Sequence, residues 1–179
     1  FQPINCLDLV YYYKSSKNLQ TISKSSFANT WKNISQNFKK ITFSMALLEL
    51  TDKCLGENDP HVDLYDELFN ALYTIDNNKK NDNLIFWYYQ YQLLNKLGFK
   101  PDFSLKDQSN TPLPNPYGST NSKIIFDCFE KNNSGFDEDL SLSPKDRKII
   151  SNYLNTCIKI HFEGVDSFKS LKFMKDTMG

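Results

Sequence analysis

Between residues 34 and 97, the hydrophobic and polar positions repeat with the spacing of amphipathic helices. Apolar residues recur at intervals of three, four and seven from Ile34 to Leu55, which predicts a first helix that Gly56 ends. A second helix is predicted from Pro60 to Ile75, with Asp59 as its N-cap. Each of these segments has an apolar face, so we expect both helices to pack against other elements.

The next segment, from about Leu84 to Leu97, is apolar nearly all round, and Gly98 follows it. This pattern is typical of a central, buried helix. Its aromatic run could also serve as a platform for stacked bases, but helical spacing favours core packing. We therefore expect four side chains from the three helices to share a buried interface: Leu48, Leu68, Trp87 and Leu94.

The first 23 residues have the pattern of a β-hairpin. Cys6–Tyr13 is rich in β-forming residues, Ser15–Asn18 supplies a polar turn, and Leu19–Ser23 returns. A two-stranded hairpin is only marginally stable by itself in water. Because the chain begins at Phe1, we expect a fragment or a processed form whose earlier strands are missing.

The C-terminal part opens with a loop at about 100–122 that is rich in proline, followed by an apolar stretch, 123–129, that fits a strand or a helix equally well. The last clear helix begins at Ser143 as N-cap, with Pro144 at the first helical position and Asp146 at the third. A short helix at about 167–174 closes the chain, and the predicted fold class is mainly α.

The net charge of zero conceals strong segregation of charge along the chain. Residues 1–53 carry seven lysines and three acids (+4), residues 54–76 carry six acids and no base (−6), and residues 145–179 carry seven bases and four acids (+3). Arg147 is the only arginine, against twenty lysines. Lysine lacks the planar fork that reads guanine, so any nucleic acid is expected to be bound through phosphate attraction and stacking, without sequence readout. Ordinary solvated faces are the alternative explanation of the same charges.

The sequence contains no recognisable catalytic or metal-binding motif. The four cysteines form no C-x-x-C pair, which predicts reduced thiols, no zinc and no disulfide framework. His61 lies at a helix start, and His161 lies near a helix end, with which it would interact favourably when protonated. Asp63 and Glu67 fit a solvated helix face. We therefore expect no catalytic residue, no metal and no cofactor, and the absence of a long apolar run argues against a membrane span.

Five short sequence motifs, which we call words, occur in an order that resembles the bacterial RecO family over most of the chain. The words are Phe1-Gln2-Pro3 through Leu19-Gln20-Thr21-Ile22, Leu48-Glu49-Leu50 within 38–55, the segment Leu64–Leu72, Gln90–Phe99 ending in Leu97-Gly98-Phe99, and Ile160-His161-Phe162 followed by Gly164 and Lys169-Ser170.

The resemblance implies the end of an OB-fold (two strands, residues 1–26) followed by a RecO-like α-helical domain (27–179). It also implies a non-catalytic recombination mediator of the bacterial cytosol and nucleoid that binds single- and double-stranded DNA and promotes annealing. With RecR, such a protein helps RecA to replace single-stranded DNA-binding protein (SSB). An OB surface binds single strands by charge and stacking, so the expected DNA contacts are Lys14, Lys17, Lys24, Lys32, Lys39, Lys40, Tyr11 and Tyr13.

A helical adaptor that binds only protein is the alternative interpretation, and salt dependence separates the two, since DNA binding weakens steeply with salt. The chain also departs from the family. Many members carry a four-cysteine zinc site after the leucine-glycine-aromatic word, whereas residues 100–135 contain only Cys128. Many also carry arginines where this chain has Trp87, Tyr88 and Leu171, so this chain lacks the charges with which those positions would recognise acidic partner tails such as that of SSB.

Overall fold

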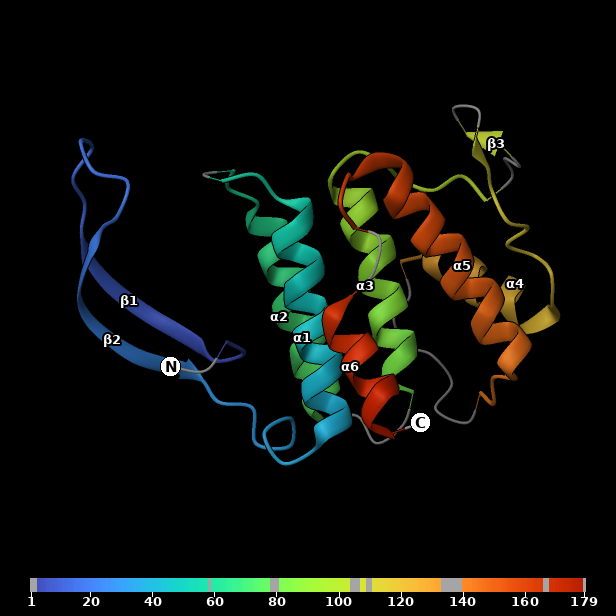
Figure 1. Cartoon of the computed structure of the whole chain (residues 1–179), viewed down its shortest axis with the longest axis horizontal. Coiled ribbons are helices and arrows are strands. Elements are labelled where there is room, and N and C mark those ends of the chain that lie inside the picture. The colour runs from blue at the N-terminus through green and yellow to red at the C-terminus, as the bar shows by residue number, and fades with distance from the viewer. Residues whose placement is uncertain are drawn as a thin grey trace.

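An N-terminal β-hairpin and a body of helices make up the part of the chain that the structure, a computed structural model, describes: residues 3–57, 59–77, 81–103, 107–108, 111–132, 140–165 and 168–178. The hairpin pairs β1 (Cys6–Tyr12) with β2 (Thr21–Asn29), and it stands to one side of the helices (Figure 1). The helices are α1 (Phe38–Cys54), α2 (Val62–Asn77), α3 (Asp82–Lys96), α4 (Thr120–Glu130), α5 (Pro144–His161) and α6 (Lys169–Met178). The predicted class, mainly α with an N-terminal hairpin, is confirmed.

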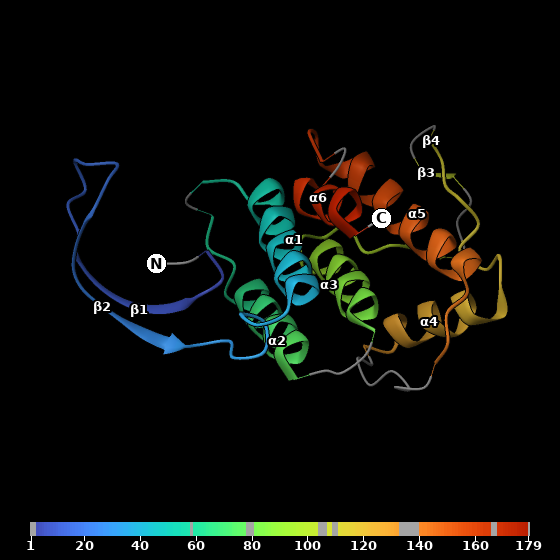
Figure 2. The ribbon, with the colours of Figure 1, turned by 60° about the horizontal axis from the view of Figure 1, so that its bottom comes forward.

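Helix α3 lies at the centre of the helical body. It contacts α1, α2 and α5, and Figure 2 shows it between the α1–α2 pair and the α4–α5 pair. Trp87, Tyr89, Tyr91 and Leu94 are all buried, which confirms the prediction of a central helix and assigns its aromatic run to the core. Phe126, Phe129 and Tyr153, from α4 and α5, extend this aromatic core on the far side.

The core face of α1 is not the predicted one. Its buried apolar residues are Phe43, Ala46, Leu47 and Leu50, whereas the predicted stripe of Ile41, Met45 and Leu48 is only half-buried. The expected burial of Leu48 is therefore wrong, and so is that of Leu68, which is also half-buried. The physical reason is that α1 carries apolar residues on two faces: one packs on α3, and the other borders α6. The helix also begins at Phe38, because the Asn37 side chain caps it by accepting a hydrogen bond from the Lys40 amide at 3.2 Å.

The start of α5 follows the predicted capping pattern. The Ser143 hydroxyl accepts a hydrogen bond from the Asp146 amide at 3.2 Å, and an Asp146 carboxylate oxygen accepts one from the Ser143 amide at 2.9 Å. The ambiguous stretch after the loop is helical as α4, which begins with its own capping box between Ser119 and Ser122. Asn121 of α4 donates to the same Asp146 carboxylate at 3.1 Å, so one acid joins the starts of both helices.

Two of the words that resemble the RecO family meet where α3 ends. Gly98 has a φ of 84°, a left-handed conformation that glycine adopts at low cost, and it turns the chain so that the Phe99 amide donates to the Leu94 carbonyl at 2.8 Å. The Phe99 ring then stacks on the His161 imidazole, with centroids 4.3 Å apart. Burial lowers the pKa of His161 below its ordinary value.

The segment between the hairpin and α1 is fastened to the helical body. Trp31 is buried, and its indole N–H donates to the Ile4 carbonyl at 2.8 Å. Its ring lies 5.4 Å from that of Phe69 on α2. An oxygen of the buried Asp76 carboxylate accepts hydrogen bonds from the Asn33 and Ile34 amides, each at 2.8 Å. The base of the hairpin is therefore held against α2.

Several element ends differ from their predicted positions. β2 continues to Asn29, past Ser23 where the returning strand was predicted to end, and α2 begins at Val62 rather than Pro60. The loop before α4 contains a short ladder of β3 (Asp107–Gln108) and β4 (Thr111–Pro112). Phe103 and Leu113 in this loop are buried, so the loop is anchored to the core at these points. Residues 1 and 2, which open the first shared word, lie outside the described residues.

Candidate functional sites

The turn of the hairpin presents two lysines to solvent. The Gln20 side-chain amide closes the turn: its oxygen accepts from the Lys14 amide at 2.8 Å, and its nitrogen donates to the carbonyls of Lys14 and Lys17 at 3.1 and 2.7 Å. Because the backbone of both lysines is held in this way, their exposed side chains project from an ordered turn. Two of the predicted DNA contacts therefore lie close together.

The strands beside this turn are rich in exposed aromatic surface. Tyr11, Tyr12 and Tyr13 are 54, 67 and 72% exposed, so none of the three rings is committed to the core. Lys24 lies opposite Val10, and the register then shifts because Ser23 forms a bulge whose hydroxyl donates to the Val10 carbonyl at 3.1 Å. The hairpin thus combines exposed cations with exposed aromatic rings.

The other three predicted lysines are placed differently. Lys32 is exposed in the segment between β2 and α1. Lys39 is exposed, but its ammonium lies 3.6 Å from a carboxylate oxygen of Asp82 and 5.9 Å from the Phe43 ring centroid. Lys40 donates to the carbonyls of Ile75 and Asp76 at 2.6 and 2.9 Å, and so caps the C-terminal end of α2. The structure therefore separates Lys14, Lys17 and Lys24 on the hairpin from Lys39 and Lys40 on the helical body.

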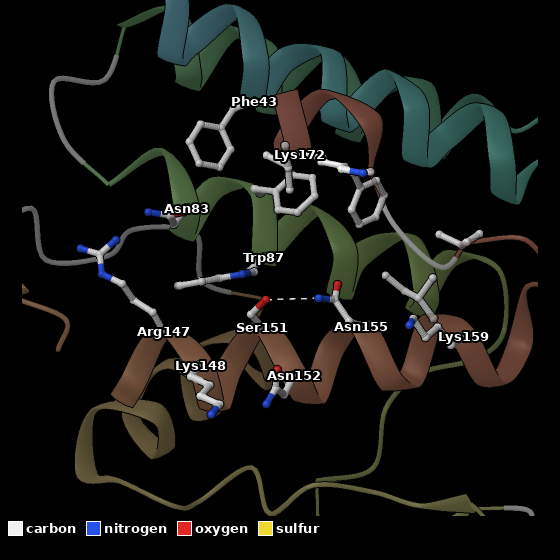
Figure 3. A pocket seen from close by; sticks show the side chains of 15 residues that line it. Phe43, Asn83, Trp87, Arg147, Lys148, Ser151, Asn152, Asn155, Lys159 and Lys172 are labelled. Carbon is white, nitrogen blue, oxygen red and sulfur yellow. Dashed lines mark hydrogen bonds between the residues drawn. The ribbon is translucent and has the colours of Figure 1, made fainter. Parts of the chain in front are cut away.

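A second candidate site is a groove of about 590 Å³ between α5, α6 and one edge of α3, which we call the α5–α6 groove (Figure 3). Its cationic side chains are Arg147, Lys148 and Lys159 from α5 and Lys172 from α6. Its apolar lining is Phe43, Phe86, Trp87, Ile158, Val165, Phe168 and Leu171, and its amides are Asn83, Asn152 and Asn155.

Polar contacts order the wall of this groove. Gln90 on α3 donates to the Asn155 side-chain carbonyl at 3.1 Å, and Asn155 donates to the Ser151 hydroxyl at 3.2 Å, an interaction that Figure 3 marks. Among the described residues that line the groove there are four cations and no carboxylate, so its lining carries a net positive formal charge. An anionic group with an apolar neighbour is the ligand that such a lining fits.

Sequence reasoning did not identify this groove, although one signal for it was present. Arg147, Ser151 and Asn155 recur at intervals of four along α5, as do Lys148 and Asn152 on the adjoining row. Together they form a continuous polar stripe on the side of α5 away from its buried residues Ile150, Tyr153 and Leu154. What the sequence could not indicate is that the aromatic edge of α3 and the side chains of α6 face this stripe.

The remaining chemically suggestive residues form no site in the described part of the chain. His61 lies 3.0 Å from the Asp59 carboxylate at the start of α2, and Asp63 pairs with Lys96 at 3.7 Å. Within the described ranges, no three His, Cys, Asp or Glu side chains gather as they would around a metal ion. None of the described helices is both long and apolar enough to cross a membrane.

These observations define a class of protein: a mainly α-helical domain that carries a basic, aromatic hairpin at its N-terminal end and a basic groove on its far side. The family model "Recombination protein O C terminal" matches residues 35–156, which is 122 of the 179 residues. The chain belongs to the RecO family.

Relatives with curated names agree with this membership. DNA repair protein RecO of Salinibacter ruber is 29% identical over 100 residues, 56% of this chain and 38% of the relative. DNA repair protein RecO of Chloroherpeton thalassium is 28% identical over 99 residues, 55% of this chain and 38% of the relative. That of Exiguobacterium sibiricum is 29% identical over 92 residues, 51% of this chain and 36% of the relative. The matched segment therefore spans little more than a third of these relatives.

Proposed function

We propose that this protein is a non-catalytic DNA-binding mediator of recombination and DNA repair. It binds single- and double-stranded DNA, promotes annealing, and acts with RecR to help RecA replace SSB on single-stranded DNA. Membership of the RecO family supports the general role, because the relatives are named as DNA repair proteins. The observation that carries DNA binding is the exposure of Lys14, Lys17 and Lys24 beside the tyrosines of the same hairpin.

The expected mode of binding follows from the side chains available. Lysine ammonium groups neutralise phosphates as point charges, and the exposed tyrosine rings offer faces on which bases of any sequence stack. Base–aromatic stacking contributes roughly 1–3 kcal/mol per base. Because the only arginine, Arg147, lies in the α5–α6 groove, the hairpin has no residue for bidentate recognition of guanine. Binding is therefore expected to depend on salt and to be indifferent to sequence.

The test changes Lys14, Lys17 and Lys24 together to glutamine and measures the fluorescence anisotropy of a labelled single strand of about 30 nucleotides at several salt concentrations. The matched control changes Lys100, Lys123 and Lys131, which are also exposed but lie on the helical body, to glutamine. Both variants lose the same formal charge, so a difference between them reports position and not net charge.

The hairpin variant should bind more weakly at all sequences alike. Its slope of log affinity against log salt should fall by up to about 0.7 for each phosphate that the removed lysines had neutralised. The control variant should retain affinity and slope. Equal behaviour of the two variants would show that DNA binds elsewhere or responds only to overall charge.

The α5–α6 groove supports a proposal for the SSB partner. Trp87, which stands where many family members carry arginine, lines this groove beside the cations of α5 and α6. We propose that in this chain Arg147, Lys148, Lys159 and Lys172 supply the positive charge for the acidic tail of SSB, and that Trp87 and Phe168 form an apolar floor. The arrangement pairs a polar rim with an apolar centre, as in peptide-binding sites generally.

A synthetic SSB tail peptide tests this part of the proposal by calorimetry. Changing Lys148 and Lys172 to glutamine should weaken binding about fivefold to thirtyfold, since each rim charge contributes on the order of 0.5–1 kcal/mol. Changing Lys100 and Lys123, which do not line the groove, should have no effect. A peptide whose acidic residues are replaced by their amides should bind weakly to every variant.

A protein-only adaptor remains the alternative function, and the acidic face of α2 is the observation that favours it. Val62, Tyr65 and Tyr73 are exposed on this helix, together with Asp63 and Asp66. An adaptor would bind partner protein with little dependence on salt and would bind no DNA. The salt series on the hairpin variant and the wild type therefore separates the two functions. A pull-down of RecR with the same purified protein tests the proposed partner.

A further inference from the structure

A single carboxylate on α1 holds the start of α6. Glu49 accepts hydrogen bonds from the Lys169 amide at 3.0 Å, the Ser170 amide at 3.2 Å and the Ser170 hydroxyl at 3.0 Å. A helix begins with N–H groups that lack partners inside the helix, and an acidic side chain there also interacts favourably with the helix dipole. Glu49 therefore supplies from another element the cap that α6 needs.

The same carboxylate positions a neighbouring cation. Lys53, one turn along α1, lies 3.1 Å from a Glu49 oxygen, and its ammonium lies 5.9 Å from the centroid of the Phe168 ring. Phe168 is buried and meets Phe86 of α3 edge-on, with ring centroids 5.5 Å apart. Glu49 is thus linked through Lys53 to the side chain that precedes α6.

What Glu49 holds in place is one wall of the α5–α6 groove. Phe168, Leu171 and Lys172 all line the groove, although Glu49 itself does not. Lys169 and Ser170, its hydrogen-bond partners, lie on the opposite side of α6 beside the half-buried stripe of α1. The views in Figures 1 and 2 agree that α6 lies against α1 next to α3.

We infer that Glu49 is a positioning residue of the α5–α6 groove: its negative charge docks α6 on α1 and thereby sets the groove wall formed by Phe168, Leu171 and Lys172. The groups that face Glu49 are cations or donors from both elements, Lys53 on α1 and the amides and hydroxyl of α6, so charge matters as well as shape. This inference concerns the geometry of the groove, and its link to a bound tail rests on the function proposed above.

The experiment compares Glu49→Gln, which keeps the side-chain volume but removes the charge, with Asp52→Asn as its matched control. Asp52 is an exposed acid three residues further along α1. Hydrogen–deuterium exchange is measured at the Lys172 amide, which bonds to the Phe168 carbonyl at 3.0 Å at the start of α6. In a Trp31→Phe background, which leaves Trp87 as the only tryptophan, acrylamide quenching reports exposure of the groove floor. Affinity for the SSB tail peptide is the third measurement.

Glu49→Gln should speed exchange at Lys172 by about tenfold or more, because hydrogen bonds to a charged group are the stronger ones. It should also increase quenching of Trp87 and weaken peptide binding, whereas Asp52→Asn should change none of the three. Ser170→Ala, which removes only one of the three donors to Glu49, should give a smaller change in the same direction.

Unchanged exchange and quenching in Glu49→Gln would overturn the inference. Faster exchange with unchanged quenching would overturn it as well, since α6 would then loosen without altering the groove. If wild-type protein binds no SSB tail peptide, the proposed function of the groove fails, but exchange and quenching still decide whether Glu49 positions its wall.

Discussion

The carboxylate of Asp76, at the end of α2, accepts a 2.8 Å hydrogen bond from the backbone amide of Ile34, forty-two residues earlier in the chain. The same oxygen accepts a second bond of 2.8 Å from the Asn33 amide. Both Asp76 and Ile34 are buried, so these bonds are shielded from water. They fasten the segment that leads out of the hairpin to the helical body, and so determine where the proposed DNA contacts stand.

Asp76→Ala should destabilise the protein by about 2–4 kcal/mol, because it leaves two backbone amides without the charged acceptor that they share. Urea unfolding followed by circular dichroism measures the loss. Asp66→Ala, on the exposed face of the same helix, serves as the control and should change stability by less than about 0.5 kcal/mol. Similar losses for the two variants would mean that Asp76 does not hold this segment.

Two adjacent leucines on α1 test which face of that helix is the core. Leu47 has no exposed surface, whereas Leu48 is half-buried on the side toward α6. Leu47→Ala should cost about 2–5 kcal/mol, and Leu48→Ala should cost less than half as much because part of its surface is already in water. Chemical unfolding of both variants measures the loss in free energy of unfolding. A larger loss for Leu48→Ala than for Leu47→Ala would reverse the assignment of the faces.

Asp146 should make stability depend on acidity. Hydrogen bonds from the Ser119 and Ser143 side chains are the largest influences on its pKa, and together with those from the Ser143 amide and Asn121 they outweigh burial and hold the pKa well below the ordinary value. A carboxyl whose pKa is lowered on folding adds stability above its unfolded pKa, about 3.9, and this contribution is lost as the pH falls toward the folded value.

The comparison of wild type with Asp146→Asn should therefore show a gap in stability of about 1 kcal/mol or more at neutral pH that narrows as the pH falls below about 4. Thermal unfolding across this pH range measures the gap. Glu130→Gln, an exposed change on α4, is the control. A gap between wild type and Asp146→Asn that stays constant with pH would show that the carboxylate's charge contributes nothing to the two helix starts.

Zinc content is the simplest test of the departure from the family's cysteine pattern. Residues 100–135 contain one cysteine, Cys128, which is half-buried on α4. With one thiol there, the four ligands that structural zinc requires are not available. Elemental analysis of the purified protein is expected to show no stoichiometric zinc, and one equivalent would contradict this prediction.

Three of the five words that carried the resemblance to the RecO family lie in contact in the folded chain. Glu49, in the middle of the leucine-glutamate-leucine word, caps α6 at the Lys169-Ser170 pair. Phe99, which ends the leucine-glycine-aromatic word, stacks on His161 of another word. Short words that are far apart in sequence thus mark two points where the helical body is joined.

Features that depend on neighbours in sequence could be predicted without the fold. The capping box of Ser143 and Asp146 needs only residues three positions apart. The burial of α3 follows from apolar side chains on every face, since no orientation of such a helix leaves it a polar side. The hairpin likewise follows from two β-rich runs joined by a polar turn.

Only the tertiary structure decided which of the two apolar faces of α1 became the core, because both have helical spacing and the choice depends on which helix covers each face. It also decided that Lys40 caps α2 whereas Lys14 and Lys17 stay exposed, since an ammonium group binds whatever carbonyls the fold brings within reach. The α5–α6 groove arises in the same way, from side chains of α3, α5 and α6 that have no fixed relation in sequence. Periodicity determines that a helix has a face, but contacts between distant elements determine what that face meets.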